Sequence, residues 1–454
     1  MKASWQARMW LSVIGFGGLA ASALAAESGP ARVTFTKDVL PILQEKCQEC
    51  HRAGQMAPMS LMTYDEVRPW AKAIRENVSA GKMPPYFADK ASLPMKHDQS
   101  LSQVQKDTIL AWIDSGTTKG SEKDMPAPRK FSESEWRLGD PDVVLQPVEP
   151  FDVPAGDGDL YQCFAVPFAS ANDLWLKGVE FKPDNLKAVH HFILFEDKLG
   201  KFKEFDAATP EPGCECEDMD KVLQGTTMVQ MWAPGNVQPL ARTGEAKKLN
   251  AKSNFILQVH YHNTTGEPQV DRSKFALYLA KPEEQVQKEV RGQLVVQPNL
   301  FIKAGDPESK FQATYTIKED ITVYSSGVHM HYRGKNMGLW AVRPGETDET
   351  TLVWVPNYDF NWQLTYEFAE PWKAPAGTKF TMRCTFDNST NNPFNPDPTK
   401  DVRWGLASTD EMAFSGYSYV VDSEALKSTP EKPKGLVQGP GLVKVSDPEF
   451  LGTD

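Results

Sequence analysis

The stretch SNFILQVHYHN, residues 253–263, indicates the fold class of most of the chain. In it, Phe255, Leu257, Val259 and Tyr261 alternate with Ile256, Gln258, His260 and His262. Because successive side chains of a strand point to opposite faces, this period of two predicts a β-strand with two unlike faces.

Short runs of the same kind recur on both sides of this stretch, at LWLKGVEF, AVHHFILF, TVYSSGVHMHY, TLVWVP and FTMRCTF. Pro, Gly, Asn and Asp separate the runs, and no long helical pattern lies between them. We therefore expect residues from about 140 to 425 to form two sandwiches of antiparallel strands.

The preceding residues have a helical pattern instead. The clearest helix is LSQVQKDTILAWIDSG, in which Ser102 and Gln105 make a capping box. Ile109, Trp112 and Ile113 follow at the spacing of one helical face. We expect a small all-α domain over residues 30–122.

Composition predicts the remaining boundaries. Residues 123–139 are polar and contain prolines, which is typical of a linker, and the Pro-, Gly- and Lys-rich residues 426–454 predict an extended tail. The first 25 residues combine basic residues, an apolar stretch and a final Ala-Leu-Ala, which predicts a cleaved signal peptide and a periplasmic or secreted protein.

Net charge and hydropathy exclude several kinds of partner. The net charge is −11, with acidic and basic residues mixed along the chain, which argues against nucleic acid. No segment after the predicted signal peptide is apolar for long enough to cross a bilayer, so we expect no membrane insertion.

The helical region contains the motif CQECH, residues 47–51. In a CxxCH motif the thiols of Cys47 and Cys50 can form thioethers to a haem, and His51 can bind the iron. A disulfide or half of a zinc site are the alternatives, but a zinc site needs further Cys or His nearby, and the next cysteine is Cys163. We predict one covalently bound haem c.

Five methionines of the same region, Met56, Met59, Met62, Met83 and Met95, are candidates for the second axial ligand. Met83 precedes two prolines in GKMPPY, a stiff loop that could hold a thioether in one position. The region resembles a small cytochrome c domain, and in that family such a methionine is the usual distal ligand. We therefore predict Met83, with Met59 as the alternative.

Six of the eight histidines form three pairs: His190-His191, His260-x-His262 and His329-x-His331. An HxH pair on a strand points both imidazoles to one face, whereas adjacent histidines need a bulge or different ring nitrogens to share an ion. Three such pairs on predicted strands indicate metal binding, and imidazole ligands suit copper or zinc.

The histidine pairs lie within a longer resemblance. The strings DLYQCFAVPF, FKPDNLKAVHHFILF, FILQVHYHN, GVHMHYRGK and STDEMAFSGY make residues 140–425 similar to the copper type II, ascorbate-dependent monooxygenases. This is the family of peptidylglycine α-hydroxylating monooxygenase and dopamine β-monooxygenase. The resemblance implies two tandem all-β, jelly-roll-like sandwiches, which we assign to residues 140–288 and 289–425.

The resemblance also implies two copper ions. His190, His191 and His260 match the three-histidine copper that passes electrons. His329, His331 and Met412 match the catalytic copper that binds and activates dioxygen. His262 has no counterpart, so it is an additional ligand, a residue that supports a ligand or a surface residue, and we favour the second role. The isolated His97 is expected at the surface.

Two departures from the family concern the substrate. The peptide-hydroxylating member anchors a carboxylate with an Arg two residues before the HxH and a Tyr four residues after the ligand Met. This chain has Gly327 and Gly416 at those positions. A glycine-extended peptide is therefore not the expected substrate.

A further departure concerns a disulfide. In the family, a Cys just after the ligand Met pairs with a Cys that corresponds to Cys384 in FTMRCTF. Here Ala413 replaces the first cysteine, so Cys384 lacks that partner. For Cys163 we expect a disulfide with Cys214 or Cys216.

These features predict an exported copper-dependent monooxygenase that hydroxylates a C–H bond of a small organic substrate with dioxygen. Because a haem is fused to the chain, we expect it to deliver the electrons, with a small reductant or a redox protein as their source. The alternatives are a non-catalytic haem and copper protein for electron transfer or copper sensing, and an oxidase that releases peroxide.

Overall fold

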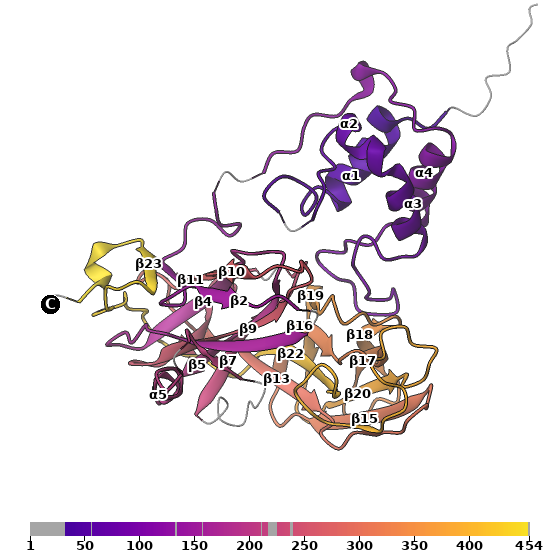
Figure 1. Ribbon diagram of the computed structural model, residues 1–454. Helices are drawn as coiled ribbons and strands as arrows, with labels where there is room; N and C mark the ends of the chain where they lie inside the picture. The colour runs from indigo at the N-terminus through magenta and orange to yellow at the C-terminus, as the bar shows by residue number, and fades with distance from the viewer. Residues whose placement is uncertain are drawn as a thin grey trace, which may run out of the picture.

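The computed structural model describes residues 32–452 except 56, 132–133, 157, 210, 217–224 and 237–238. The predicted signal peptide, residues 1–25, lies outside the described residues. Strands are the main regular structure of the described chain, and helices are few and mainly near the N-terminus (Figure 1). Within the described residues, no helix combines the length and the apolar character that crossing a membrane would need.

The helical region lies above the strands in Figure 1. Its elements are η1 (Phe35–Val39), α1 (Leu40–Lys46), α2 (Tyr64–Val67), η2 (Arg68–Trp70), α3 (Ala71–Ser79), α4 (Gln103–Asp114) and η3 (Glu122–Asp124). The predicted helix is present as α4, and Ser102 and Gln105 form the predicted capping box at its start. Phe35, Leu43 and Trp112 are buried at the centre of a small apolar core.

Two sheets pack face to face after the linker and form the first sandwich. The six-stranded sheet has the order β12 (Lys288–Glu289), β8 (Glu245–Leu249), β4 (Leu174–Lys182), β11 (Lys274–Leu279), β1 (Val143–Leu145), β23 (Leu442–Val445). The five-stranded sheet has the order β6 (Cys214–Glu215), β3 (Asp159–Val166), β9 (Asn254–His262), β5 (Val189–Asp197), β7 (Thr226–Trp232). The strands β2 (Phe151–Val153) and β10 (Gln269–Asp271) form a small separate sheet, and α5 spans Phe202–Asp206.

Strand β9 confirms the strand predicted from residues 253–263, and it lies at the centre of the five-stranded sheet. Leu257 and Val259 belong to the core between the two sheets. Gln258 and His260, on the opposite face, are buried as well. On this face Ile256 packs with Phe202 and Cys216 of the first sandwich, and Leu406 of the second sandwich packs against the same cluster.

The second sandwich consists of two four-stranded sheets. One has the order β13 (Arg291–Val296), β22 (Phe414–Val421), β16 (Ile321–His329), β19 (Thr365–Ala374). The other has the order β15 (Ser309–Thr316), β20 (Lys379–Phe386), β17 (Gly334–Val342), β18 (Thr350–Val355). Strands β14 (Phe301–Ile302) and β21 (Val402–Arg403) pair beside them. Val323, Leu339 and Phe380 lie in its core.

The segment predicted as an extended tail differs from that expectation, because it returns to the first sandwich. Strand β23 pairs with β1 at the edge of the six-stranded sheet, and η4 spans Pro448–Phe450. Leu436 and Phe450 are buried in the first core. The prolines and glycines around LVKV made this short strand hard to recognise, but its apolar residues have a place to pack.

Residues 84–98, here called the docking loop, join the helical region to the second sandwich (Figure 1). The backbone N–H groups of Asp89, Leu93 and Lys96 donate to the carbonyls of Trp354, Thr351 and Glu367, and that of Ala369 donates to Pro94. Tyr86, Phe87, Leu93 and Met95 also pack against the core of the second sandwich. These contacts attach the helical region to strands β18 and β19.

Candidate metal centres and their cavities

Three histidines of the first sandwich converge on one point. The Nδ1 atom of His190 lies 3.2 Å from that of His191 and 3.1 Å from that of His260, and the last two are 3.1 Å apart. Among the described residues, these three form the group whose ligand atoms could share a metal ion. The spacing suits one ion bound by three nitrogens at the bond length of about 2.0–2.1 Å usual for imidazole.

A bulge in β5 lets the adjacent histidines face the same point. Val189 pairs with Tyr261 and His191 pairs with His260, so His190 is an extra residue between the two pairs. An extra residue in one strand turns its side chain away from strict alternation. This is one of the two arrangements that the sequence required for an adjacent pair.

Asp159, at the start of β3, contacts His260 through its carboxylate. One carboxylate oxygen lies 2.9 Å from His260 Nε2 and 3.0 Å from His262 Nδ1, and the other accepts a hydrogen bond from the Tyr332 hydroxyl at 3.0 Å. The Asp159 carboxylate lies on the Nε2 side of His260, whose Nδ1 faces the other two histidines. His262 therefore lies beside the cluster and contacts a residue that supports it.

Burial keeps the three imidazoles neutral. It lowers the pKa of His190 to about 3 and that of His191 well below its ordinary value, and it lowers the pKa of His260 as well. Burial alone would raise the pKa of Asp159, but hydrogen bonds from His260 and Tyr332 outweigh it and lower this pKa. Neutral imidazoles have free lone pairs for a metal, with little competition from protons.

The second donor set lies at the end of β16. The rings of His329 and His331 are 5.2 Å apart between centroids and meet edge to face. His329 Nδ1 lies 2.7 Å from the Gln363 side-chain oxygen, and His331 Nδ1 lies 3.3 Å from the Asp410 carbonyl oxygen. Because both Nδ1 atoms face acceptors, both Nε2 atoms are left to bind a metal. Met412 lines the same cavity as these two histidines.

Burial again favours neutral rings in this second set, because it lowers the pKa of His329 to about 4 and that of His331 to about 3. The side chain of Glu411 accepts hydrogen bonds from the backbone N–H groups of His331 and Arg333, at 2.9 and 2.6 Å. Burial raises the pKa of Glu411 to about 8. Since Glu411 immediately precedes Met412, it ties the Met412 segment to the histidine strand.

Phe360 packs between the two donor sets. Its ring centroid lies 5.6 Å from that of His190, 6.4 Å from that of His260 and 5.7 Å from that of His331. The Asn236 side chain also donates to the Gln363 carbonyl at 2.9 Å across the junction of the two sandwiches. The Phe360 ring thus contacts histidines of both sets.

A cavity of about 270 Å³ opens between the two sandwiches, here called the inter-sandwich cavity. His191 lines it from the first sandwich, and His329, His331 and Met412 line it from the second. Both donor sets therefore contribute to the wall of one cavity.

A second cavity, of about 470 Å³, lies between the helical region and the sandwiches, here called the helical-region cavity. Its lining includes all the residues predicted to hold a haem, Cys47, Cys50, His51 and Met83, together with Met59. His190 and His262 line it from the first sandwich. The structure thus brings the CxxCH motif and His190, one of the three converging histidines, to the same cavity.

The remaining methionine candidates and His97 are placed elsewhere. Met95 forms a β-bridge with Phe368 and packs against the second sandwich. Met62 is absent from the described lining of the helical-region cavity, and Met56 lies outside the described residues. The side chain of His97 is 55% exposed, which leaves it at the surface.

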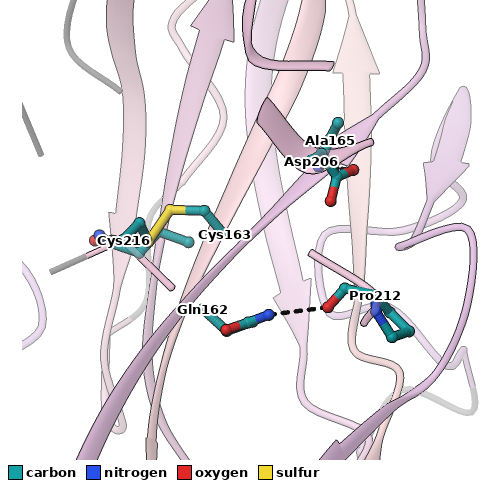
Figure 2. The surroundings of a disulfide bond; sticks show 7 residues. Gln162, Cys163, Ala165, Asp206, Pro212 and Cys216 are labelled. Carbon is teal, nitrogen blue, oxygen red and sulfur yellow. Dashed lines mark hydrogen bonds between the residues drawn. A yellow bond between two sulfur atoms is a disulfide. The ribbon is translucent and has the colours of Figure 1, made fainter. Parts of the chain in front are cut away.

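Figure 2 shows the disulfide, which joins Cys163 to Cys216. Of the two partners left open by the sequence, the structure selects Cys216. Next to the bond, the Gln162 side chain donates to the Pro212 carbonyl at 2.9 Å (Figure 2). Cys216 also lines the inter-sandwich cavity. Cys384 is a buried thiol, in agreement with the loss of its family partner.

Comparison with known families gives one match. Residues 294–427 match the C-terminal domain of the copper type II ascorbate-dependent monooxygenases. The matched segment contains His329, His331 and Met412 and supports a copper monooxygenase. No curated protein matches the chain.

Solved structures similar to the chain include three with little sequence identity. A subviral particle of infectious bursal disease virus VP2 is 10% identical, with 64% of this chain and 74% of that chain covered and a TM-score of 0.18. The STIV MCP is 10% identical, with 62% and 94% covered and a TM-score of 0.22. PNGF-II is 8% identical, with 61% and 65% covered and a TM-score of 0.25. These scores are too low to support an argument.

Proposed function

We propose that the chain, whose residues 294–427 match a copper monooxygenase domain, is an exported enzyme that hydroxylates a C–H bond with dioxygen. The observation that carries the proposal is that two buried sets of metal donors, one with a thioether and one without, line the same cavity. Copper bound at both sets would supply the one-electron chemistry by which one oxygen atom enters the substrate and the other leaves as water.

The residues of the two sets suit different tasks. His190, His191 and His260 offer three imidazole nitrogens and suit an ion that changes oxidation state without binding substrate. The Met412 thioether beside two imidazoles favours Cu(I), the state that meets dioxygen. The Phe360 ring contacts histidines of both sets and lines the cavity that they share.

We further propose that a haem c occupies the helical-region cavity. The fit is favourable because both thiols and His51 line this cavity and His51 Nδ1 lies 3.2 Å from the Met59 carbonyl oxygen, which leaves Nε2 for the iron. Met59 is already held beside His51 by this contact, so we retain Met83 as the second axial ligand. The haem would supply electrons one at a time.

The positions of His190 and His262 support the proposal that the haem delivers electrons to the three-histidine set. His190 lines the helical-region cavity and is itself one of the three converging histidines. His262 lines the same cavity and contacts Asp159, which in turn contacts His260. Donor and acceptor on one chain meet without a diffusional encounter.

The proposal is tested by the rate at which dioxygen reoxidises the haem. The full-length, metal-loaded protein is reduced anaerobically and mixed with dioxygen in a stopped-flow spectrometer. We expect fast reoxidation in the wild type and a large decrease in both His260→Ala and Met412→Ala. The control is His97→Ala, because His97 is exposed and belongs to neither set. Equal rates in all four proteins would show that the haem does not feed the copper sites.

Product analysis separates the enzymatic alternatives. A monooxygenase transfers one labelled atom from ¹⁸O₂ to product, an oxidase releases stoichiometric peroxide, and an electron-transfer or copper-sensing protein consumes no dioxygen catalytically. Haem attachment is checked independently with Cys47→Ala and Cys50→Ala, each of which should abolish normal attachment, judged by haem staining on a denaturing gel.

A further inference from the structure

We propose that the inter-sandwich cavity receives a compact, uncharged, apolar substrate, about the size of one six-membered ring with a short substituent. The inference rests on the proposed monooxygenase function and gives that function its substrate class. Its basis is the size of the cavity, the chemistry of its wall and the presence of glycine at both positions that carry the carboxylate anchor in the peptide-hydroxylating enzyme.

The size of the cavity limits the substrate. An apolar cavity of about 150 Å³ in another protein stays dry and binds benzene. The inter-sandwich cavity, at about 270 Å³, has room for a ring and a short substituent. It is smaller than the range of about 300–1,000 Å³ typical of pockets for larger ligands.

Most residues that line the cavity are apolar. Ile193 and Met231 line it from the first sandwich, and Leu294, Trp404, Leu406 and Phe414 line it from the second. No Asp, Glu, Lys or Arg occurs among the described lining residues. A charged substrate would therefore lose its hydration without gaining an ionic partner.

The neutral polar side chains of the wall already have partners. The Tyr161 hydroxyl lies 2.6 Å from that of Ser408, and the Gln258 side-chain nitrogen lies 3.5 Å from Cys216 Sγ. The two metal-donor sets account for the lining histidines. The wall therefore recognises its substrate mainly by shape and apolar contact.

Two lining residues mark the side of the cavity that faces solvent. Leu294 on β13 is 39% exposed and Met228 on β7 is 37% exposed, whereas the other lining residues are less exposed. A substrate that enters between these strands meets an aliphatic and a thioether side chain. An apolar entrance gives no attraction to an ion in solution.

The positions that anchor a carboxylate in the similar peptide-hydroxylating enzyme carry no side chain here. Gly327 and Gly416 face each other in the register of β16 and β22. A Cβ atom on Gly416 would lie only 2.9 Å from Leu294 Cδ2. Leu294 thus occupies the space in which a side chain at 416 would stand, and it makes this part of the wall apolar.

The test measures binding rather than turnover. Full-length, copper-loaded, oxidised protein is titrated by calorimetry with ethylbenzene, benzylammonium and benzoate, which have similar size and different charge. We expect ethylbenzene to bind at least about tenfold more tightly than either ion, because only ethylbenzene enters without an unpaired charge. Equal or tighter binding of an ion would overturn the inference.

A charge introduced at the entrance locates the binding site. Leu294→Asp should weaken ethylbenzene binding about tenfold or more and strengthen benzylammonium binding. The matched control is Val437→Asp, because Val437 is 67% exposed and absent from the cavity lining. Equal effects of the two substitutions would also overturn the inference. Ethylbenzene binding without any oxygen transfer would instead refute the proposed function and leave the cavity assignment standing.

Discussion

Replacement of Asp159 by Asn is expected to weaken copper binding at the three-histidine set and to spare the other set. The carboxylate contacts His260, His262 and Tyr332 at 2.9–3.0 Å. Asn can retain one acceptor oxygen for the histidines, but it loses the negative charge that fixes Nε2–H on His260. The ring is then less firmly held with Nδ1 towards the metal.

The size of the effect follows from the contact that is lost. A hydrogen bond to a charged group contributes about 1.5–3 kcal/mol, and about 1.4 kcal/mol corresponds to a tenfold change in affinity. We therefore expect copper affinity to fall about 10- to 100-fold, the range usual for partners of metal-bound histidines. The assay is competition with a chromophoric Cu(I) chelator, in which the second site serves as an internal reference.

Two further variants serve as controls for the Asp159 substitution. Tyr332→Phe removes one hydrogen bond to Asp159 but keeps the contact with His260, so its effect should be small. Asp152→Asn removes the same charge at an exposed position of the first sandwich and should have no effect. The reasoning is refuted if Asp159→Asn leaves the affinity unchanged or lowers it equally at both sites.

Three other predictions concern metal content, the disulfide and pH. His190→Ala should lower the copper content from two ions to one per haem iron, and elemental analysis that shows loss of both would contradict separate sites. Cys163→Ala with Cys216→Ala should lower the free energy of unfolding by about 4 kcal/mol, because the bond closes a loop with a sequence separation of 53, and urea denaturation measures it. In the metal-free protein, burial holds the pKa of His329 at about 4 and those of His190 and His331 at about 3, against 6.5 ordinarily. At pH values between the folded-state and the ordinary pKa, the unfolded chain binds more protons than the folded chain. The free energy of unfolding should therefore fall as the pH drops from about 6.5 to about 3. A flat profile over that window would count against neutral buried histidines.

Local sequence patterns were sufficient to predict the elements whose signals lie within a few residues. The alternation in residues 253–263 predicted β9, and the capping box at Ser102 predicted the start of α4. The adjacent histidines needed either a bulge or different ring nitrogens to share an ion, and the structure has the bulge at His190.

Contacts between distant segments were not visible in the sequence. Asp159 begins the string DLYQCFAVPF and Phe360 lies in none of the quoted strings, but the role of each appears only when other strands bring the histidines to it. Glu411 lies in the string STDEMAFSGY, but only the fold shows that its carboxylate accepts a hydrogen bond from the backbone N–H of His331. The strand β23 was hidden for the same reason, since its partner β1 lies far away in the chain.

The docking loop also has a consequence for the solubility of the protein. Strands β18 and β19 are the outermost strands of the two sheets of the second sandwich, and the docking loop hydrogen-bonds to both. Uncovered strand edges pair readily with other chains and lead to aggregation. A shortened chain without residues 32–98 would expose both edges, so we expect it to self-associate. We therefore expect the docking loop to protect these two edges from pairing with other chains.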